Sequence, residues 1–168
     1  MILVRGSFTG IRIGVASGKA FSDGLNIPCV GVSSLEALAY NVKNSEIVCS
    51  ILDCKNDNCY FALYENNNGN IETLIEPSAE DILSCLNIIQ SYCSDSLGNK
   101  KITFVGDGSK IFKNKIKEFF ENAKFATKDL NVLNSYNLGI CGFKKYNNGS
   151  DFENELLPLY LKKPQVQN

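Results

Sequence analysis

Two short segments of the sequence combine residue types that could bind an anion. Residues 14–20 (GVASGKA) hold glycines and a lysine as phosphate-binding loops do, and residues 106–109 (GDGS) follow an expected strand and precede an expected helix. The first segment has three residues between its glycines instead of four, and Ala20 stands where a hydroxyl is needed to hold magnesium. In the second segment Asp107 would repel an anion at the helix N-terminus. We therefore predict no phosphate site in either segment, and a tight turn at 106–109.

The other candidates for chemistry are two carboxylates, two lysines and seven cysteines. Asp53 and Asp57 flank an expected turn, and without a third ligand they are interpreted as solvated carboxylates rather than a metal pair. Lys162 and Lys163 could contact RNA phosphate, although two lysines are a weak signal. The cysteines include no CxxC pair, so we interpret them as reduced thiols that pack as small apolar residues.

Composition excludes several kinds of catalysis. The 168 residues include no histidine, which removes Ser-His and Cys-His nucleophile pairs and every imidazole metal site. The formal net charge of −1 gives no overall basic field for nucleic acid or anionic membrane. No apolar run approaches the length of a membrane span, and no signal peptide is visible. We expect a cytoplasmic protein that binds no membrane, metal or cofactor.

The most unusual element is a helix expected from about residue 6 to residue 25. Glycine recurs there at every fourth position: Gly6, Gly10, Gly14 and Gly18. Because residues four apart share one side of a helix, this side carries almost no side chains, and another backbone can approach it closely. The pattern leaves open whether that backbone belongs to the same domain or to a partner. Arg12, Lys19 and Asp23 argue against a membrane span.

The rest of the chain predicts an α/β domain. After a short strand at 29–32, Ser33 and Glu36 form a capping-box pattern that opens a helix. Hydrophobic patterns then predict strands over 46–54, 59–64 and 71–75, a helix capped by Ser78, a strand over 101–105 and a helix with its apolar face between 112 and 120. A helix over about 135–146 and an extended tail over 157–164 follow.

The order strand–strand–strand–helix–strand–helix is one half of an actin-like, ribonuclease-H-like architecture. We predict that residues 35–168 form this complete lobe with an extended C-terminal tail. Residues 1–34 are expected to be a remnant of the other lobe, with the glycine-striped helix and one strand.

Residues 6–14 (GSFTGIRIG) resemble a motif of the TsaB family, bacterial partner proteins in the synthesis of threonylcarbamoyladenosine in tRNA. Residues 25–28 (LNIP), 30–39 (VGVSSLEALA) and 158–165 (PLYLKKPQ) are similar to that family as well. The resemblance runs from Gly6 to about Gln165, and it implies a two-lobed actin-like fold. The family motif normally begins Gly-Pro, where this chain has Val4-Arg5. The family's first three strands, first helix and phosphate loop are expected to be missing, so ATP binding is not expected.

The resemblance also implies a non-catalytic role. Family members lack the metal-binding histidines of their catalytic paralogue TsaD, and they pair with that paralogue. A TsaE-like ATPase joins through the complex. The complex transfers a threonylcarbamoyl group to the adenosine beside the anticodon of tRNAs that read codons beginning with A. The resemblance implies that this chain meets tRNA only indirectly.

In that family the helix after GSFTG packs in a helical bundle against the paralogue or a second copy of itself. The interface residues that the resemblance implies here are Ser7, Phe8, Gly10, Ile11, Arg12, Gly14, Val15, Gly18 and Lys19. Two alternatives stay open. One is a metal-independent, peptidase-like enzyme of the same superfamily, and the other is a truncated, self-associating fragment without activity.

Overall fold

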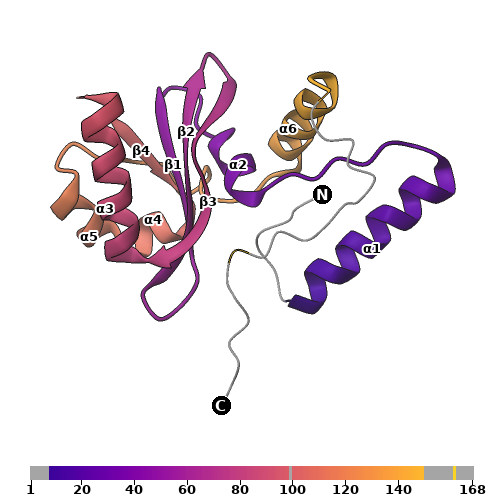
Figure 1. The fold of residues 1–168 in the computed structure, drawn as a ribbon, viewed down its shortest axis with the longest axis horizontal. Coiled ribbons are helices and arrows are strands. Elements are labelled where there is room, and N and C mark those ends of the chain that lie inside the picture. The colour runs from indigo at the N-terminus through magenta and orange to yellow at the C-terminus, as the bar shows by residue number, and fades with distance from the viewer. Residues whose placement is uncertain (1–7, 99, 150–160, 162–168) are drawn as a thin grey trace.

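A computed structural model describes residues 8–98, 100–149 and 161. Its centre is a five-stranded mixed sheet in the order β3-β2-β1-β4-β5. β1 pairs antiparallel with β2, and β2 with β3, whereas β4 runs parallel to β1 and β5 parallel to β4. Helices α3, α4 and α5 lie on one side of the sheet, and α2 and α6 lie on the other (Figure 1). The predicted α/β class is confirmed.

The three antiparallel strands follow one another along the chain. They are β1 (Ile47–Asp53), β2 (Asn58–Asn67) and β3 (Asn70–Asp81). Between β2 and β3, Asn68 and Gly69 both have positive φ, at 54° and 87°, as a tight hairpin turn requires. All three predicted strands are confirmed, and β3 is much longer than predicted.

The length of β3 corrects the predicted start of the next helix. Ser78 is not a helix cap, because it pairs with Phe61 inside the sheet. Helix α3 (Ile82–Tyr92) is capped instead by Asp81, whose Oδ1 accepts hydrogen bonds from the N–H of Leu83 at 3.0 Å and of Ser84 at 3.1 Å. The strand tolerates Pro77 because β3 is the edge strand, where a missing N–H need not break a ladder.

The second half of the sheet begins after a π-helical turn, η1 (Cys93–Leu97), that the sequence did not predict. Strand β4 (Ile102–Val105) is confirmed. The helix predicted around residues 112–120 is two short helices, α4 (Asp107–Ile111) and α5 (Lys113–Phe119), which meet at the buried Phe112. A two-residue strand, β5 (Lys124–Phe125), then closes the sheet.

The sheet has an apolar layer on each face. In β1, Ile47, Cys49 and Ile51 pack toward α3 and α5, while Val48 and Leu52 pack toward α2. Strand side chains alternate between the two faces, so a mostly apolar strand such as β1 must be covered on both. Helix α3 packs on one of these layers with four buried residues: Ile82, Cys85, Leu86 and Ile89.

Outside the sheet lie α1 (Phe8–Leu25), α2 (Ser34–Ala39) and α6 (Ser135–Asn147), at or near the predicted positions. The strand predicted at 29–32 is wrong, because only Val32 forms a single isolated bridge. Ser33 caps α2 as predicted, accepting from the N–H of Leu35, whereas the Glu36 carboxylate forms an ion pair with Lys145 at 2.9 Å.

Of the predicted tail over 157–164, all but Leu161 lies outside the described residues. Leu161 packs against the core layer on the α2 side. Within the described part of the chain, no helix has both the length and the hydropathy needed to cross a membrane.

Candidate protein-interaction site

Helix α1 lies apart from the sheet, and one of its faces is exposed and uncharged (Figure 1). Residues spaced by three or four positions fall on one side of a helix. Here that side is made by eight residues, all exposed: Gly10, Ile13, Gly14, Ser17, Ala20, Phe21, Gly24 and Leu25. We call them the α1 face. The side chains of Ile13 and Phe21 remain 61 % and 68 % exposed, which is unusual for large apolar groups.

The opposite side of α1 is partly covered. Val15 is buried, and Ile11, Gly18 and Lys19 are half-buried. Arg12 and Asp23 are exposed on the α1 side that lies away from the α1 face. The α1 face therefore consists entirely of apolar and small residues, because the charged residues lie on other sides of the helix.

The structure divides the interface residues that the sequence predicted. Gly10 and Gly14 lie in the α1 face, whereas Ile11, Val15, Gly18 and Lys19 lie on the covered side and Arg12 beside them. Ser7 is outside the described residues, and only the backbone of Phe8 is described. The sequence reasoning missed Ile13, Ser17, Phe21, Gly24 and Leu25. The signal available in the sequence was a set of uncharged residues spaced three or four positions apart along the helix.

The glycines of the α1 face have open space beside them. A Cβ atom added to Gly14 or Gly24 would meet no atom within 4 Å. Glycine inside a helix costs about 1 kcal/mol relative to alanine, and packing within the described chain does not require it at these two positions. The openness supports the interpretation that another backbone approaches here. Residues 14–20, which resemble a phosphate loop, lie in the middle of α1. Backbone N–H groups there donate to carbonyls of the helix itself and are not free to bind phosphate.

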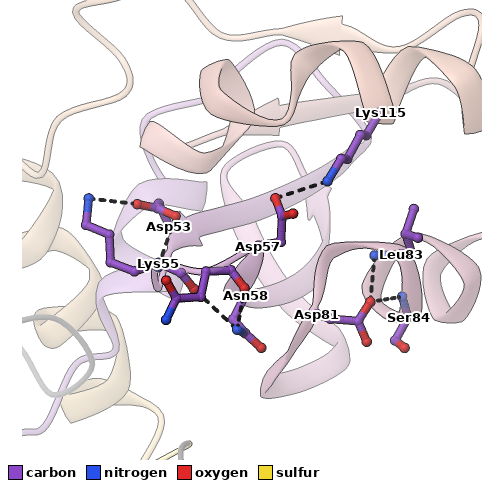
Figure 2. A network of polar contacts seen from close by, with 9 residues as sticks. Asp53, Lys55, Asp57, Asn58, Asp81, Leu83, Ser84 and Lys115 are labelled. Carbon is purple, nitrogen blue, oxygen red and sulfur yellow. Dashed lines mark hydrogen bonds and ion pairs between the residues drawn. The ribbon is translucent and has the colours of Figure 1, made fainter.

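The carboxylates at the β1–β2 turn belong to ion pairs, as Figure 2 shows. Asp53 lies 3.1 Å from Lys55, and Asp57 lies 3.0 Å from Lys115. The two differ, since the side chain of Asp57 is mostly exposed and that of Asp53 is mostly buried. Only Asp57 fits the predicted solvated carboxylate. Among the described residues no group of three histidine, cysteine or acidic side chains could hold a metal ion.

The tight turn predicted at 106–109 is instead the start of a helix, because Gly106 is the residue before α4 and residues 107–109 are its first turn. The segment packs directly against β1. Gly106 has φ of 103°, and a Cβ there would lie 2.2 Å from the carbonyl oxygen of Ile51. Its N–H donates to Oδ1 of Asn131 at 2.7 Å. The Asp107 carboxylate accepts from the N–H of Asp53 at 3.1 Å. The segment thus joins β1, β4 and α4 rather than forming an anion site.

Four of the seven cysteines pack as small apolar core residues, as the sequence predicted, and the other three are half-buried. All seven are free thiols, and Cys49, Cys59, Cys85 and Cys141 are buried. Burial raises the pKa of the Cys49 thiol well above its usual value, and burial likewise raises the pKa of the Cys141 thiol. A thiol must be deprotonated to act as a nucleophile, so these groups are held in the unreactive form.

A mixed sheet of this order, covered by helices on both faces, defines the class of α/β protein built on actin-like half-repeats. The sequence matches the family model described as TsaD, tRNA N6-adenosine threonylcarbamoyltransferase, over residues 6–167. The chain belongs to this family, and the further likenesses below make it TsaB-like.

Two curated relatives are similar in sequence. The Bacillus subtilis (strain 168) tRNA threonylcarbamoyladenosine biosynthesis protein TsaB is 29 % identical over 114 residues, which are 67 % of this chain and 47 % of that protein. The uncharacterized protein ML0378 of Mycobacterium leprae (strain TN) is 34 % identical over 61 residues, which are 36 % of this chain and 16 % of that protein. This chain thus spans less than half the length of the curated relatives it matches.

Solved structures share the fold. YeaZ from Pseudomonas aeruginosa superposes with a TM-score of 0.67 at 16 % identity, covering 95 % of this chain and 74 % of that one. A structure described as an uncharacterized protein with similarity to peptidase YEAZ from Pseudomonas aeruginosa gives 0.65 at 18 % identity, covering 96 % and 73 %. With the family match, these likenesses confirm the predicted actin-like fold.

Proposed function

We propose that this chain is a non-catalytic subunit of the machinery that makes threonylcarbamoyladenosine beside the anticodon of tRNAs reading codons that begin with A. In this proposal the α1 face binds a TsaD-like catalytic subunit, and a TsaE-like ATPase joins through that complex. The observation that carries the proposal is the α1 face itself, an uncharged strip with exposed Ile13, Phe21 and Leu25. Interface centres are depleted of charge and enriched in such side chains.

The absence of obvious catalytic groups supports the non-catalytic part of the proposal. The sequence has no histidine to serve as a general base. The Asp53 and Asp57 carboxylates each form an ion pair with a lysine. The pKa of each of the thiols of Cys49, Cys85, Cys93 and Cys141 is raised, in most of them chiefly by burial. The name of the Bacillus relative supports the pathway, and the proposed location of such an assembly is the cytoplasm.

The division of the chain at residue 34 is part of the same proposal. Residues 1–34 would supply the helix that the partner meets, and residues 35–168 would supply the folded lobe that carries it. The position of α1 beside the sheet rather than on it supports this division (Figure 1). A second copy of the chain could occupy the same face, and the experiment below separates that outcome.

The test is binding of the full chain to a purified TsaD-like subunit from the same source. Replacing two exposed apolar side chains with charges, Ile13→Asp with Phe21→Asp, should weaken binding by at least about a hundredfold, because the charges would be buried in the contact. Stability should hardly change, since both side chains are exposed. Isothermal titration calorimetry measures the affinity, and urea unfolding measures the stability.

The matched control is Ile111→Asp. Ile111 is 58 % exposed and lies on α4, on the other side of the sheet from α2 and α6. It should bind as the unaltered chain does. Equal affinity for the double variant and the unaltered chain would contradict the proposal. A homodimer that the double variant abolishes, with no complex with the TsaD-like subunit at any concentration, would replace it with self-association.

A further inference from the structure

The charge of the chain is unevenly distributed along the sheet. Residues 100–128 hold eight lysines and three acidic residues, which leaves nine basic and fifteen acidic residues for the rest of the chain. At the opposite edge, β3 has no lysine or arginine and carries four acidic residues: Glu72, Glu76, Glu80 and Asp81. Because β3 and β5 are the two ends of the sheet order, the described molecule has an acidic edge and a basic edge.

Most lysines of the basic segment have no acidic partner in the described part of the chain. Lys100 pairs with Glu65 at 2.9 Å, and Lys115 pairs with Asp57 at 3.0 Å. The other six are exposed, and none of them forms an ion pair with another residue that the structure describes: Lys101, Lys110, Lys113, Lys117, Lys124 and Lys128. Intramolecular neutralisation therefore does not account for the accumulation of positive charge.

Four of these lysines come from neighbouring elements at this end of the sheet: α5, β5 and the residue before β4. Lys113 and Lys117 lie one turn apart on α5. The Lys113 Nζ lies 5.3 Å from the centre of the Phe125 ring, next to Lys124 on β5. Lys124 and Lys101 line one depression of about 540 Å³ where β1, β4 and β5 begin. We call Lys101, Lys113, Lys117 and Lys124 the lysine edge. Glu46 is the acidic residue that lines the same depression.

We propose that the lysine edge binds the phosphodiester backbone of RNA. A protein partner would need apolar surface to bury, and Ile111 is the one exposed large apolar residue of this segment, whereas the α1 face has three. A phosphate backbone needs only cations that release its counterions. Screening over about 8 Å at physiological salt keeps the acidic β3 edge from cancelling this local field.

The identity of that RNA as tRNA rests on the proposed function. The inference departs from the expectation that the chain meets tRNA only indirectly. A subunit held to its catalytic partner by the α1 face would then present the β5 end of its sheet to the substrate. The two ends of the described molecule would have different partners.

The test is fluorescence anisotropy of a labelled, unmodified tRNA transcript with the full chain, measured from 50 to 200 mM salt. Lys113→Gln with Lys117→Gln and Lys124→Gln should weaken binding about tenfold or more at 0.1 M salt. The slope of log affinity against log salt should become shallower by about 2, at roughly 0.7–0.9 for each lost phosphate contact. The same three positions changed to arginine should keep both affinity and slope.

A pair of single variants controls for net charge. Lys117→Gln and Lys55→Gln each remove one positive charge, and Lys55 is 84 % exposed at the β1–β2 turn. Only Lys117→Gln should weaken binding, by several-fold. Equal losses from the two variants, or no salt-dependent binding by the unaltered chain, would overturn the inference. So would sedimentation showing that the lysine edge holds the acidic edge of a second copy, with RNA affinity unchanged in the triple variant.

The two proposals fail separately. A chain that binds tRNA through the lysine edge but never binds a TsaD-like subunit would sustain the RNA contact and overturn the proposed function. A chain that binds the TsaD-like subunit, with RNA affinity indifferent to all three lysines, would do the reverse.

Discussion

Two glycines of the chain have opposite physical roles, and alanine substitution separates them. Gly106→Ala should lower the free energy of unfolding by about 3 kcal/mol or more, because φ is 103° and the new Cβ would lie 2.2 Å from the Ile51 carbonyl oxygen. Gly14→Ala should raise it by about 0.5–1 kcal/mol, because the site is helical and open. Urea unfolding measures both, and a destabilised Gly14→Ala variant would contradict the open site.

The same substitution at Gly14 bears on the partner. If a second backbone packs against this glycine, the added methyl group should weaken binding of a TsaD-like subunit about tenfold while the chain itself becomes more stable. Calorimetry on the variant measures the loss of affinity, and urea unfolding measures the gain in stability. Unchanged affinity would mean that the contact is made elsewhere on the helix.

Asp81 makes the start of α3 sensitive to acid. Its pKa lies below the usual value, because its carboxylate accepts hydrogen bonds from the Ser84 hydroxyl and then from the backbone N–H groups of Ser84 and Leu83. A lowered folded-state pKa gives stability that is present above the unfolded-state pKa of about 3.9 and is lost as the pH falls through the folded-state value.

Asp81→Asn isolates that contribution, because asparagine can cap the helix without a charge. The variant should lose less stability than the unaltered chain between pH 5 and pH 2, as followed by urea unfolding at each pH. Asp81→Ala should lower the urea midpoint at pH 7, where Asp81→Asn stays close to the unaltered chain. Identical acid profiles for all three would show that the carboxylate does not contribute to stability.

Residue-level reasoning from the sequence succeeded where local chemistry decides. The Ser33 cap follows from a side chain that accepts a hydrogen bond from the N–H of Leu35, two residues along the chain. The reasoning failed where a distant partner decides. Glu36 has the spacing of a capping box, but its carboxylate forms an ion pair with Lys145 on α6. No local sequence pattern reveals a partner more than a hundred positions away.

At the scale of elements, buried asparagines join α2 to the segment that leads into α6. The Asn41 Nδ2 donates to the carbonyls of Leu130 at 2.7 Å and Val132 at 2.9 Å. Its Oδ1 accepts from Asn134 at 2.9 Å and Asn137 at 2.6 Å. The Asn41 side chain thus forms hydrogen bonds with two carbonyls and two amides. It links α2 to the start of α6, although all five strands lie between these helices in the sequence.

Asn41→Leu should therefore destabilise the protein by about 2–4 kcal/mol, because it leaves two carbonyls and two amides without a partner. Asn114→Ala, an exposed position on α5, should change stability by less than about 0.5 kcal/mol. Chemical denaturation measures both. A small effect at Asn41 would show that water readily replaces the network.

The existence of elements was more predictable than their limits. The long strands and α3 follow from apolar spacing, and α1 was expected from the spacing of its glycines. The end of β3 did not, because Ser78 and Asp81 are both good caps, and pairing of Ser78 with Phe61 decides between them. Strand β5 has two residues, too few for any pattern, and it exists because β4 offers an open edge.

For the whole molecule, the arrangement separates two surfaces of different chemistry. The α1 face is apolar and uncharged, and helix α1 lies on the same side of the sheet as α2 and α6 (Figure 1). The lysine edge is charged and nearly free of exposed large apolar groups, and it lies around β5 at the end of the sheet. Net charge alone, at −1, conceals this separation. The resemblance in the sequence pointed to α1, although only Gly10 and Gly14 of the residues that it implied lie in the α1 face. Only the sheet order places the lysines at one end of the sheet.

The central claim is that the α1 face is the surface that meets the TsaD-like subunit. Hydrogen–deuterium exchange of the full chain, with and without that subunit, tests it most directly. We expect amide protection on binding to be concentrated in residues 10–25, while the strands of the sheet exchange as they do in the chain alone. Protection that spares residues 10–25 and appears on another element, or no protection at saturating partner, would contradict it.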